Sequence, residues 1–147
     1  MRNRRGFNLF ELLIAMLLFS ALLAFAIPTI RYYQRETLRA TINGDLRILQ
    51  AALKTYFPVH QHYPDPVGYQ SLLSQADPAI IDRPLLDPFS DQGKTPYIYL
   101  LSPNKQYYVA YSVGLLGDTR AYIADTGKIT FVKGNPAVEQ WISNGRL

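Results

Sequence analysis

The run FNLFELLIAMLLFSALLAFAI, from Phe7 to Ile27, decides the fold of this 147-residue chain. At about 1.5 Å per residue it makes about 31 Å of helix, which is enough to cross the apolar core of a bilayer. Glu11 is the only charge in the run. A carboxylate inside such a helix costs about 2.5–3.5 kcal/mol, so a cation that pairs with it would offset a real penalty.

A chain terminus is the nearest candidate for that cation. If the chain is cut between Gly6 and Phe7, Phe7 carries a free ammonium group at the start of the same apolar helix. We expect Glu11 to pair with the ammonium of a neighbouring copy, which predicts a filament subunit. The alternative is a protonated Glu11 that the helix merely tolerates.

The amino terminus also has the parts of an ordinary secretory signal peptide. Basic residues precede the apolar run, and Ala24-Phe25-Ala26 could serve as a cleavage site. Against this interpretation stand Glu11 inside the apolar run and the 16 apolar or small residues that follow it.

Most of the excess positive charge is local. The chain has 15 Lys and Arg against 11 Asp and Glu, but three of the arginines lie in residues 1–6. Without them the count is 12 against 11, so the charge gives no reason to expect nucleic-acid binding. Basic residues before a first apolar helix stay in the cytoplasm, which places the rest of the chain on the other side of the membrane. The chain has no cysteine, so disulfides and thiolate metal sites are excluded.

Residues 29–57 predict an amphipathic continuation of the helix. One apolar stripe recurs at spacings of three and four, formed by Leu38, Ile42, Leu46, Leu49, Leu53 and Tyr56. Gly44 weakens this helix by about 1 kcal/mol relative to alanine. We expect one long bent helix from about residue 8 to residue 57, where Phe57-Pro58 ends it. Pro28 lies inside it, either as a point where the helix melts locally in a fibre or as a simple kink at the membrane exit.

The second half of the chain predicts a small antiparallel sheet. Strand patterns occupy residues 97–101, 107–113, 122–124 and 129–132, joined by turns as in a meander. A short helix is expected near residues 69–75, and a terminal helix from Asn135-Pro136 through Trp141. The predicted fold class is α+β, with the sheet covering the stripe of residues 38–56.

The segment Arg5-Gly6-Phe7-Asn8-Leu9-Phe10-Glu11, the apolar helix and Pro28 together resemble the prepilin leader of type IV pilins and type II secretion pseudopilins. In that family the cut follows the glycine, and the new first residue is N-methylated. A glutamate lies fifth and a proline often lies twenty-second in the mature chain. Counted from Phe7, Glu11 and Pro28 occupy those positions.

Weaker similarity to major pseudopilins continues to about residue 118. It is carried by Tyr63-Pro64, by Asp87-Pro88-Phe89 with Pro96-Tyr97-Ile98-Tyr99, and by the stretch from Tyr111 to Asp118. The acidic residue that the family has within this last turn is replaced by leucine, and the acidic, glycine-rich tail that helps to hold calcium is absent. No cofactor is therefore predicted, and Asp118 and Asp125 are left as the candidates for calcium.

The resemblance implies a leader at residues 1–6, a membrane half of the helix at 7–28 and a periplasmic domain at 29–147. It implies a single-pass protein of the bacterial inner membrane that forms a homo-oligomeric filament with other pseudopilins. Its partners would be a prepilin peptidase, a membrane platform protein and an assembly ATPase. The expected function is a pseudopilus subunit in type II secretion. The alternatives are a type IV pilin and a soluble secreted binding module cut after Ala26. No catalytic constellation appears in the sequence, and no enzyme is predicted.

Overall fold

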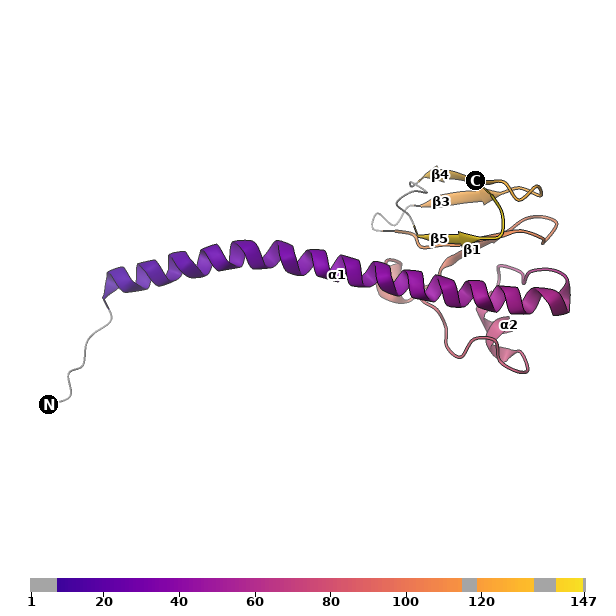
Figure 1. Cartoon of the computed structure of the whole chain (residues 1–147), viewed down its shortest axis with the longest axis horizontal. Coiled ribbons are helices and arrows are strands. Elements are labelled where there is room, and N and C mark those ends of the chain that lie inside the picture. The colour runs from indigo at the N-terminus through magenta and orange to yellow at the C-terminus, as the bar shows by residue number, and fades with distance from the viewer. Residues whose placement is uncertain (1–7, 115–118, 134–139, 147) are drawn as a thin grey trace. The chain divides into compact units, whose positions relative to one another are not determined.

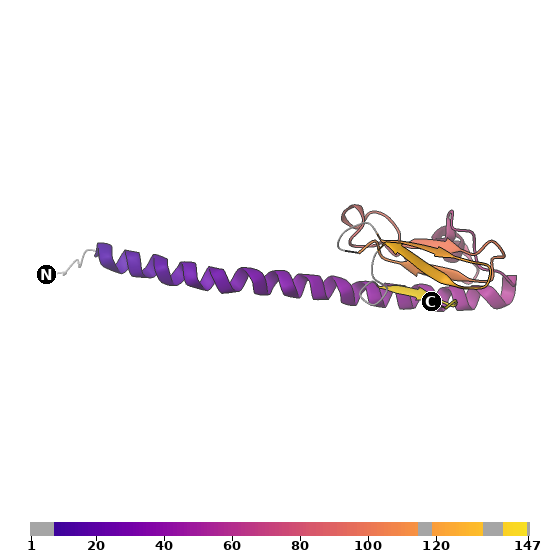
Figure 2. The same cartoon turned by 90° about the horizontal axis from the view of Figure 1, so that it is seen from above.

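The computed structural model describes residues 8–114, 119–133 and 140–146 (Figures 1 and 2). These residues fall into two compact units, one ending at Thr37 and the other beginning at Leu38. In chain order the elements are α1 (Leu9–His60), α2 (Tyr69–Gln75), a 3-10 turn η1 (Asp91–Gly93), β1 (Ile98–Leu101), β2 (Tyr108–Tyr111), β3 (Arg120–Ile123), β4 (Ile129–Lys133) and β5 (Trp141–Ser143). The expected α+β fold, a long amino-terminal helix packed against small antiparallel sheets, is confirmed.

Helix α1 is longer than the sequence pattern indicated. It contains Pro28 in its interior, and it continues through Pro58 to His60. The predicted end at Phe57-Pro58 was therefore wrong by one turn. Gln61 ends the helix instead: its φ of 60° is left-handed, its backbone N–H donates to the Phe57 carbonyl at 2.7 Å, and its side-chain amide donates to the Pro58 carbonyl at 2.8 Å. These two bonds satisfy carbonyls that a helix end leaves open.

The predicted meander was correct in its strands and wrong in its pairing. Strands β1, β2 and β5 form one antiparallel sheet in that order, whereas β3 and β4 form a separate hairpin. Every residue of β2 is buried, so this strand needs an apolar cover on both of its faces. The β3–β4 hairpin supplies the second cover, which it could not do as a continuation of the same sheet.

The predicted terminal helix is wrong at Trp141, which begins strand β5 rather than ending a helix. Asn135 and Pro136 lie outside the described residues. Strand β5 pairs with β2, with Trp141 opposite Tyr111 and Ser143 opposite Val109. The open edge of a buried strand leaves unpaired N–H and C=O groups, and pairing with β5 satisfies them.

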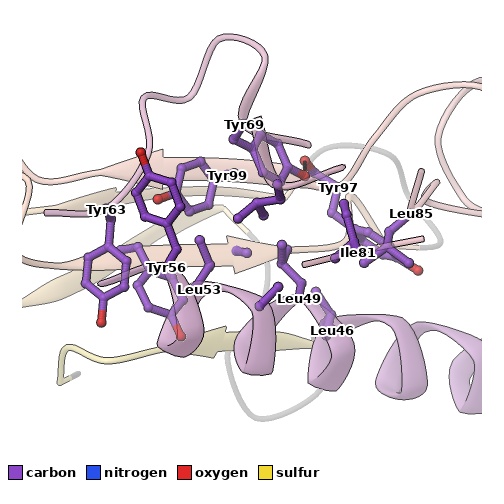
Figure 3. Packing of buried hydrophobic residues seen from close by; sticks show 14 of the residues in the cluster. Leu46, Leu49, Leu53, Tyr56, Tyr63, Tyr69, Ile81, Leu85, Tyr97 and Tyr99 are labelled. Carbon is purple, nitrogen blue, oxygen red and sulfur yellow. Dashed lines mark hydrogen bonds between the residues drawn. The ribbon is translucent and has the colours of Figure 1, made fainter. Parts of the chain in front are cut away.

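The main core lies between the second half of α1 and one face of the three-stranded sheet. Figure 3 shows Leu46, Leu49 and Leu53 extending from α1 toward the tyrosines of the segment that contains β1. Ile42, Leu49 and Leu53 have no exposed surface at all. The predicted packing stripe is thus the buried face of α1, and the burial of its apolar side chains against the sheet holds the domain on the helix.

A second, smaller core lies on the other face of the same sheet. Val109 and Tyr111 of β2 pack against Ala121 of β3 and Ile129 of β4. Tyr108 and Ala110 face the helix instead, as the two-residue period of a strand requires. The second unit therefore has three layers: helix, three-stranded sheet and hairpin (Figure 1).

Candidate functional site

The first half of α1 is an apolar helix without a cover among the described residues. It contains an 18-residue window with a mean hydropathy of 2.5, none of which is buried. Its large side chains are widely exposed, for example Leu9 at 79% and Phe25 at 77%. By length and composition this helix can cross a membrane. An apolar surface of this extent requires lipid or other protein around it.

Glu11 is the only charged residue between Asn8 and Ile30. It lies in the first turn of α1 and is exposed. The first turn of a helix carries a partial positive charge from its free N–H groups, which favours a carboxylate there. The carboxylate thus lies at the end of the apolar segment that is nearest to the cleavage position expected after Gly6.

Asn8 and Glu11 cap the start of α1 reciprocally. The Asn8 side-chain oxygen accepts a hydrogen bond from the backbone N–H of Phe10 at 3.3 Å, and a Glu11 carboxylate oxygen accepts one from the backbone N–H of Asn8 at 3.4 Å. This is a variant of the capping box, in which the Asn8 side chain accepts from the backbone N–H two residues on instead of three. The interpretation of the sequence did not include it, although Asn8-Leu9-Phe10-Glu11 carries the signal: a capping residue followed three positions later by glutamate.

The structure describes only one of the other predicted site residues of the amino terminus, Pro28. Gly6 and Phe7 lie outside the described residues, so the cleavage position stays a prediction. Pro28 lies within α1, where it removes the backbone N–H that would donate to the Ala24 carbonyl. One turn is thereby weakened, although the next residue, Thr29, donates its hydroxyl to the Phe25 carbonyl at 2.9 Å.

The two calcium candidates are not brought together by any described contact. Asp118 lies outside the described residues. One carboxylate oxygen of Asp125 accepts the backbone N–H of Asn104 at 2.8 Å, and the Asn104 side chain donates to the Asp125 carbonyl at 2.9 Å. These bonds tie two turns together, which gives Asp125 a structural role. Within residues 8–114, 119–133 and 140–146 no cluster of three or more His, Asp or Glu side chains is placed to hold a metal ion.

Three stretches of the second unit that lie far apart in the sequence meet through hydrogen bonds. The completely buried Asp87 accepts from the Ser112 hydroxyl at 2.9 Å and from the Val113 backbone N–H at 2.8 Å. The Tyr99 hydroxyl donates to the Pro64 carbonyl at 3.2 Å. Three stretches that are separate in the sequence therefore form one framework, in which these residues hold the fold together.

Sequence reasoning missed a buried acidic residue on α1. Asp45 is 6% exposed and accepts the Tyr97 hydroxyl at 3.1 Å and an Arg83 guanidinium nitrogen at 3.1 Å. Burial, followed by the nearby Asp45 carboxylate, raises the pKa of Tyr97 well above its ordinary value. The only local signal was that Asp45 interrupts the buried side of the stripe between Ile42 and Leu46.

Comparison with known proteins gives one match. A family model described as the prokaryotic N-terminal methylation motif matches residues 1–27. No curated protein and no solved structure matches the chain. The chain is therefore pilin-like and carries a prepilin leader of the pilin and pseudopilin type. The leader implies processing by a prepilin peptidase and assembly into a pilus, and with the apolar helix it indicates an anchor in the inner membrane. Proteins of this kind are typically structural rather than enzymatic.

Proposed function

We propose that this pilin-like chain is a structural subunit of a type II secretion pseudopilus, assembled from the inner membrane to drive the export of folded proteins. One observation carries the proposal: the methylation motif at residues 1–27 leads directly into an apolar helix that is exposed throughout and holds a single carboxylate. The periplasmic domain would be residues 29–147, after a leader at 1–6 and a membrane segment at 7–28.

Glu11 and Phe7 form the proposed assembly site. Cleavage between Gly6 and Phe7 frees an ammonium group, and methylation keeps it charged. At an effective dielectric near 20, a pair about 4 Å apart gains about 4 kcal/mol, comparable to the cost of placing the carboxylate in the membrane. A mispaired helix keeps that cost without the gain, so the pair sets the axial register of neighbouring copies. The exposed position of Glu11 at the helix start supports this role.

Pro28 is proposed as the point where α1 opens when subunits pack in the fibre. The turn around it already lacks one backbone hydrogen bond. The other partners follow from the same assembly route: other pseudopilins, a prepilin peptidase, a platform protein in the inner membrane and an assembly ATPase.

The choice of a pseudopilus rests on the stretches that resemble major pseudopilins. Asp87, Ser112 and Val113 belong to two of them, and hydrogen bonds join these residues in the folded domain. A type IV pilin is the alternative. Deletion of the gene separates the two: loss of exported proteins from the medium supports the pseudopilus, whereas loss of a surface fibre with normal export would mean a true pilus.

The mature amino terminus tests the class as a whole. We expect the protein purified from its own cells to begin at Phe7 and to be about 14 Da heavier than the unmodified chain, as one added methyl group requires. A chain that begins at Ile27 would be a soluble secreted domain cut after Ala26, and the proposed function would then be wrong.

A further inference from the structure

Three separate segments of the second unit enclose a polar hollow at the turn between β3 and β4. The hollow measures about 330 Å³, and its lining comes from the residue before β2, from the turn and from the chain directly after β5: Tyr107, Thr126, Gly127, Asn144, Gly145 and Arg146. A volume of this order is enough for a small organic molecule. No carboxylate lines it.

Two glycines allow the three segments to approach this closely. Gly127 has a φ of 76°, and a Cβ added to it would lie 2.7 Å from the Tyr107 ring. A Cβ added to Gly145 would collide with the Gly127 carbonyl oxygen. Only a residue without a side chain fits such positions. The Tyr107 ring therefore lies directly against the backbone of the turn.

Hydrogen bonds hold the walls of the hollow in place. The Arg146 backbone N–H donates to the Gly127 carbonyl at 2.8 Å, and the Ile129 N–H donates to the Arg146 carbonyl at 2.7 Å. The Asn144 side-chain oxygen accepts the backbone N–H of Tyr108 at 2.8 Å. A site that is built before its ligand arrives loses less conformational entropy on binding.

Two cations lie side by side at this hollow. Lys128 and Arg146 are partners in a parallel β-bridge, so their side chains start from the same face. Like charges directly opposite each other destabilise a pair of strands. No ion pair within residues 8–114, 119–133 and 140–146 includes either of them. Asp125, the one acid in residues 119–133 and 140–146, accepts the Asn104 backbone N–H instead. An anion beside the two cations would remove their repulsion.

Two hydroxyl groups at the hollow add further donors. In the part of the chain that the structure describes, neither the Tyr107 hydroxyl nor the Thr126 hydroxyl forms a hydrogen bond. The guanidinium of Arg146 can bind two oxygens of a carboxylate or a phosphate at once, and hydroxyls can donate to oxygens that remain. The groups left over by the fold are thus all suited to an oxyanion.

We propose that this hollow binds a small ligand through a carboxylate or phosphate group, with Arg146 as the main contact and Lys128, Tyr107 and Thr126 as further donors. The site goes beyond filament assembly and does not depend on it, because all of these residues belong to the unit that begins at Leu38. Arginine stays charged at any ordinary pH, so the site is ready for an anion throughout the neutral range.

Titration of the full chain in an uncharged mild detergent tests the site. Inorganic phosphate, acetate and chloride are added at equal ionic strength, and the backbone amide signals of Gly127 and Gly145 are followed by NMR. We expect saturable shifts with phosphate, with acetate or with both, and the anion that binds identifies the ligand's group. Shifts that are equal with chloride, or that are absent with both oxyanions, would overturn the proposal.

Arg146→Gln should weaken the binding of that anion about tenfold or more, because a charge-assisted pair of hydrogen bonds is lost. Arg120→Gln is the matched control, since Arg120 is also exposed and begins β3 at the other end of the hairpin; it should bind as the wild type does. Wild-type affinity in Arg146→Gln would refute the assigned contact.

Thermal unfolding in chloride separates binding from a structural role of Arg146. Arg146→Gln should not lower the unfolding midpoint there, because it removes one of two like charges. Lys128→Gln should behave in the same way and weaken anion binding about threefold, as the loss of an exposed charge predicts. A lower midpoint for Arg146→Gln would assign the side chain to the fold and overturn its role in binding.

Discussion

Asp87 is a completely buried residue whose carboxylate accepts three hydrogen bonds. Its donors are the hydroxyl of Ser112 and the backbone N–H groups of Val113 and Phe89, at 2.8–3.0 Å. Charge-assisted bonds of this kind offset the cost of burying a carboxylate. They also fix the chain directly after β2 to the segment that leads toward β1.

We expect Asp87→Ala to lower the free energy of unfolding by about 3 kcal/mol, since it leaves buried donors unpaired. Urea unfolding of the full chain in mild detergent measures the change. Asp82→Ala is the control, because Asp82 is exposed and belongs to neither hydrophobic core; it should change stability by less than about 0.5 kcal/mol. Similar values for both variants would mean that the Asp87 network contributes little.

Glu11 has two roles to distinguish, one within its own helix and one between copies of the chain. It caps α1 through the backbone N–H of Asn8, and in the proposed filament it pairs with the amino terminus of another copy. A capping role alone is worth about 1 kcal/mol of helix stability. It would not decide whether subunits assemble.

We expect Glu11→Ala to reach the membrane and remain there but to be excluded from filaments, because the register pair is lost. The readout is the fraction of the variant in sheared filaments, with its membrane fraction measured alongside. Glu36→Ala removes an exposed acid further along the same helix and should assemble normally. Normal filaments from Glu11→Ala would contradict the register role.

At the scale of elements, the main core depends on tyrosines as much as on aliphatic side chains. Tyr99 of β1 stacks on Tyr69 of α2 with ring centres 4.7 Å apart, and Tyr63 meets Tyr108 of β2 edge to face at 4.7 Å. Aromatic pairs in these arrangements add to the gain from burial. The same residues make the packing of α2 and the sheet sensitive to alkaline pH.

Burial raises the pKa of Tyr69 from 10.0 to about 12, and it raises those of Tyr99 and Tyr108 as well. The folded state therefore holds these protons more tightly than the unfolded state does. Below about pH 10 the contribution of these tyrosines to the free energy of unfolding is fully present. We expect the free energy of unfolding to fall as the pH rises through about 10 to 12, by about 1.4 kcal/mol per pH unit for each such tyrosine.

Denaturant midpoints between about pH 8 and pH 11 test this dependence. Tyr69→Phe should make the decline shallower, because one titrating group is gone. Tyr122→Phe is the control, since Tyr122 is 68% exposed, and it should leave the slope unchanged. A midpoint that stays constant to pH 11 would contradict the account.

At the scale of the whole molecule, the two compact units have opposite requirements. The unit from Leu38 onward contains every residue of both hydrophobic cores. In the unit ending at Thr37, residues 8–37 contain no core and expose their apolar surface along the helix. One unit can therefore fold by burying its own side chains, whereas the other depends on lipid or on further copies.

We expect a fragment of residues 38–147 to fold as a soluble monomer with a cooperative thermal transition, because its cores are self-contained. Circular dichroism and sedimentation measure its folding and its size. The full chain in the same buffer without detergent should aggregate, since its apolar helix is uncovered. An unfolded or aggregated fragment would show that the domain needs the first half of α1.

The sequence by itself determined the features that depend on local order. The length of the apolar run, its one carboxylate, the helical period of the packing stripe and the segments of β1 to β4 all follow from spacing along the chain. The leader motif is local in the same way, and the family match at residues 1–27 bears it out. The capping box of Asn8 and Glu11 was also readable from sequence.

Only the tertiary structure decided which segments meet. The continuous apolar run of β2 indicates that both of its faces can be buried. It does not say that β5 will pair with β2 or that the β3–β4 hairpin will lie over it. The hydrogen-bond partners of buried polar groups also lie far away along the chain: Asp87 reaches Ser112 across 25 residues, and Asp45 reaches Tyr97 across 52. Such choices depend on which complete arrangement leaves the fewest buried groups unpaired, and that is a property of the whole packed domain.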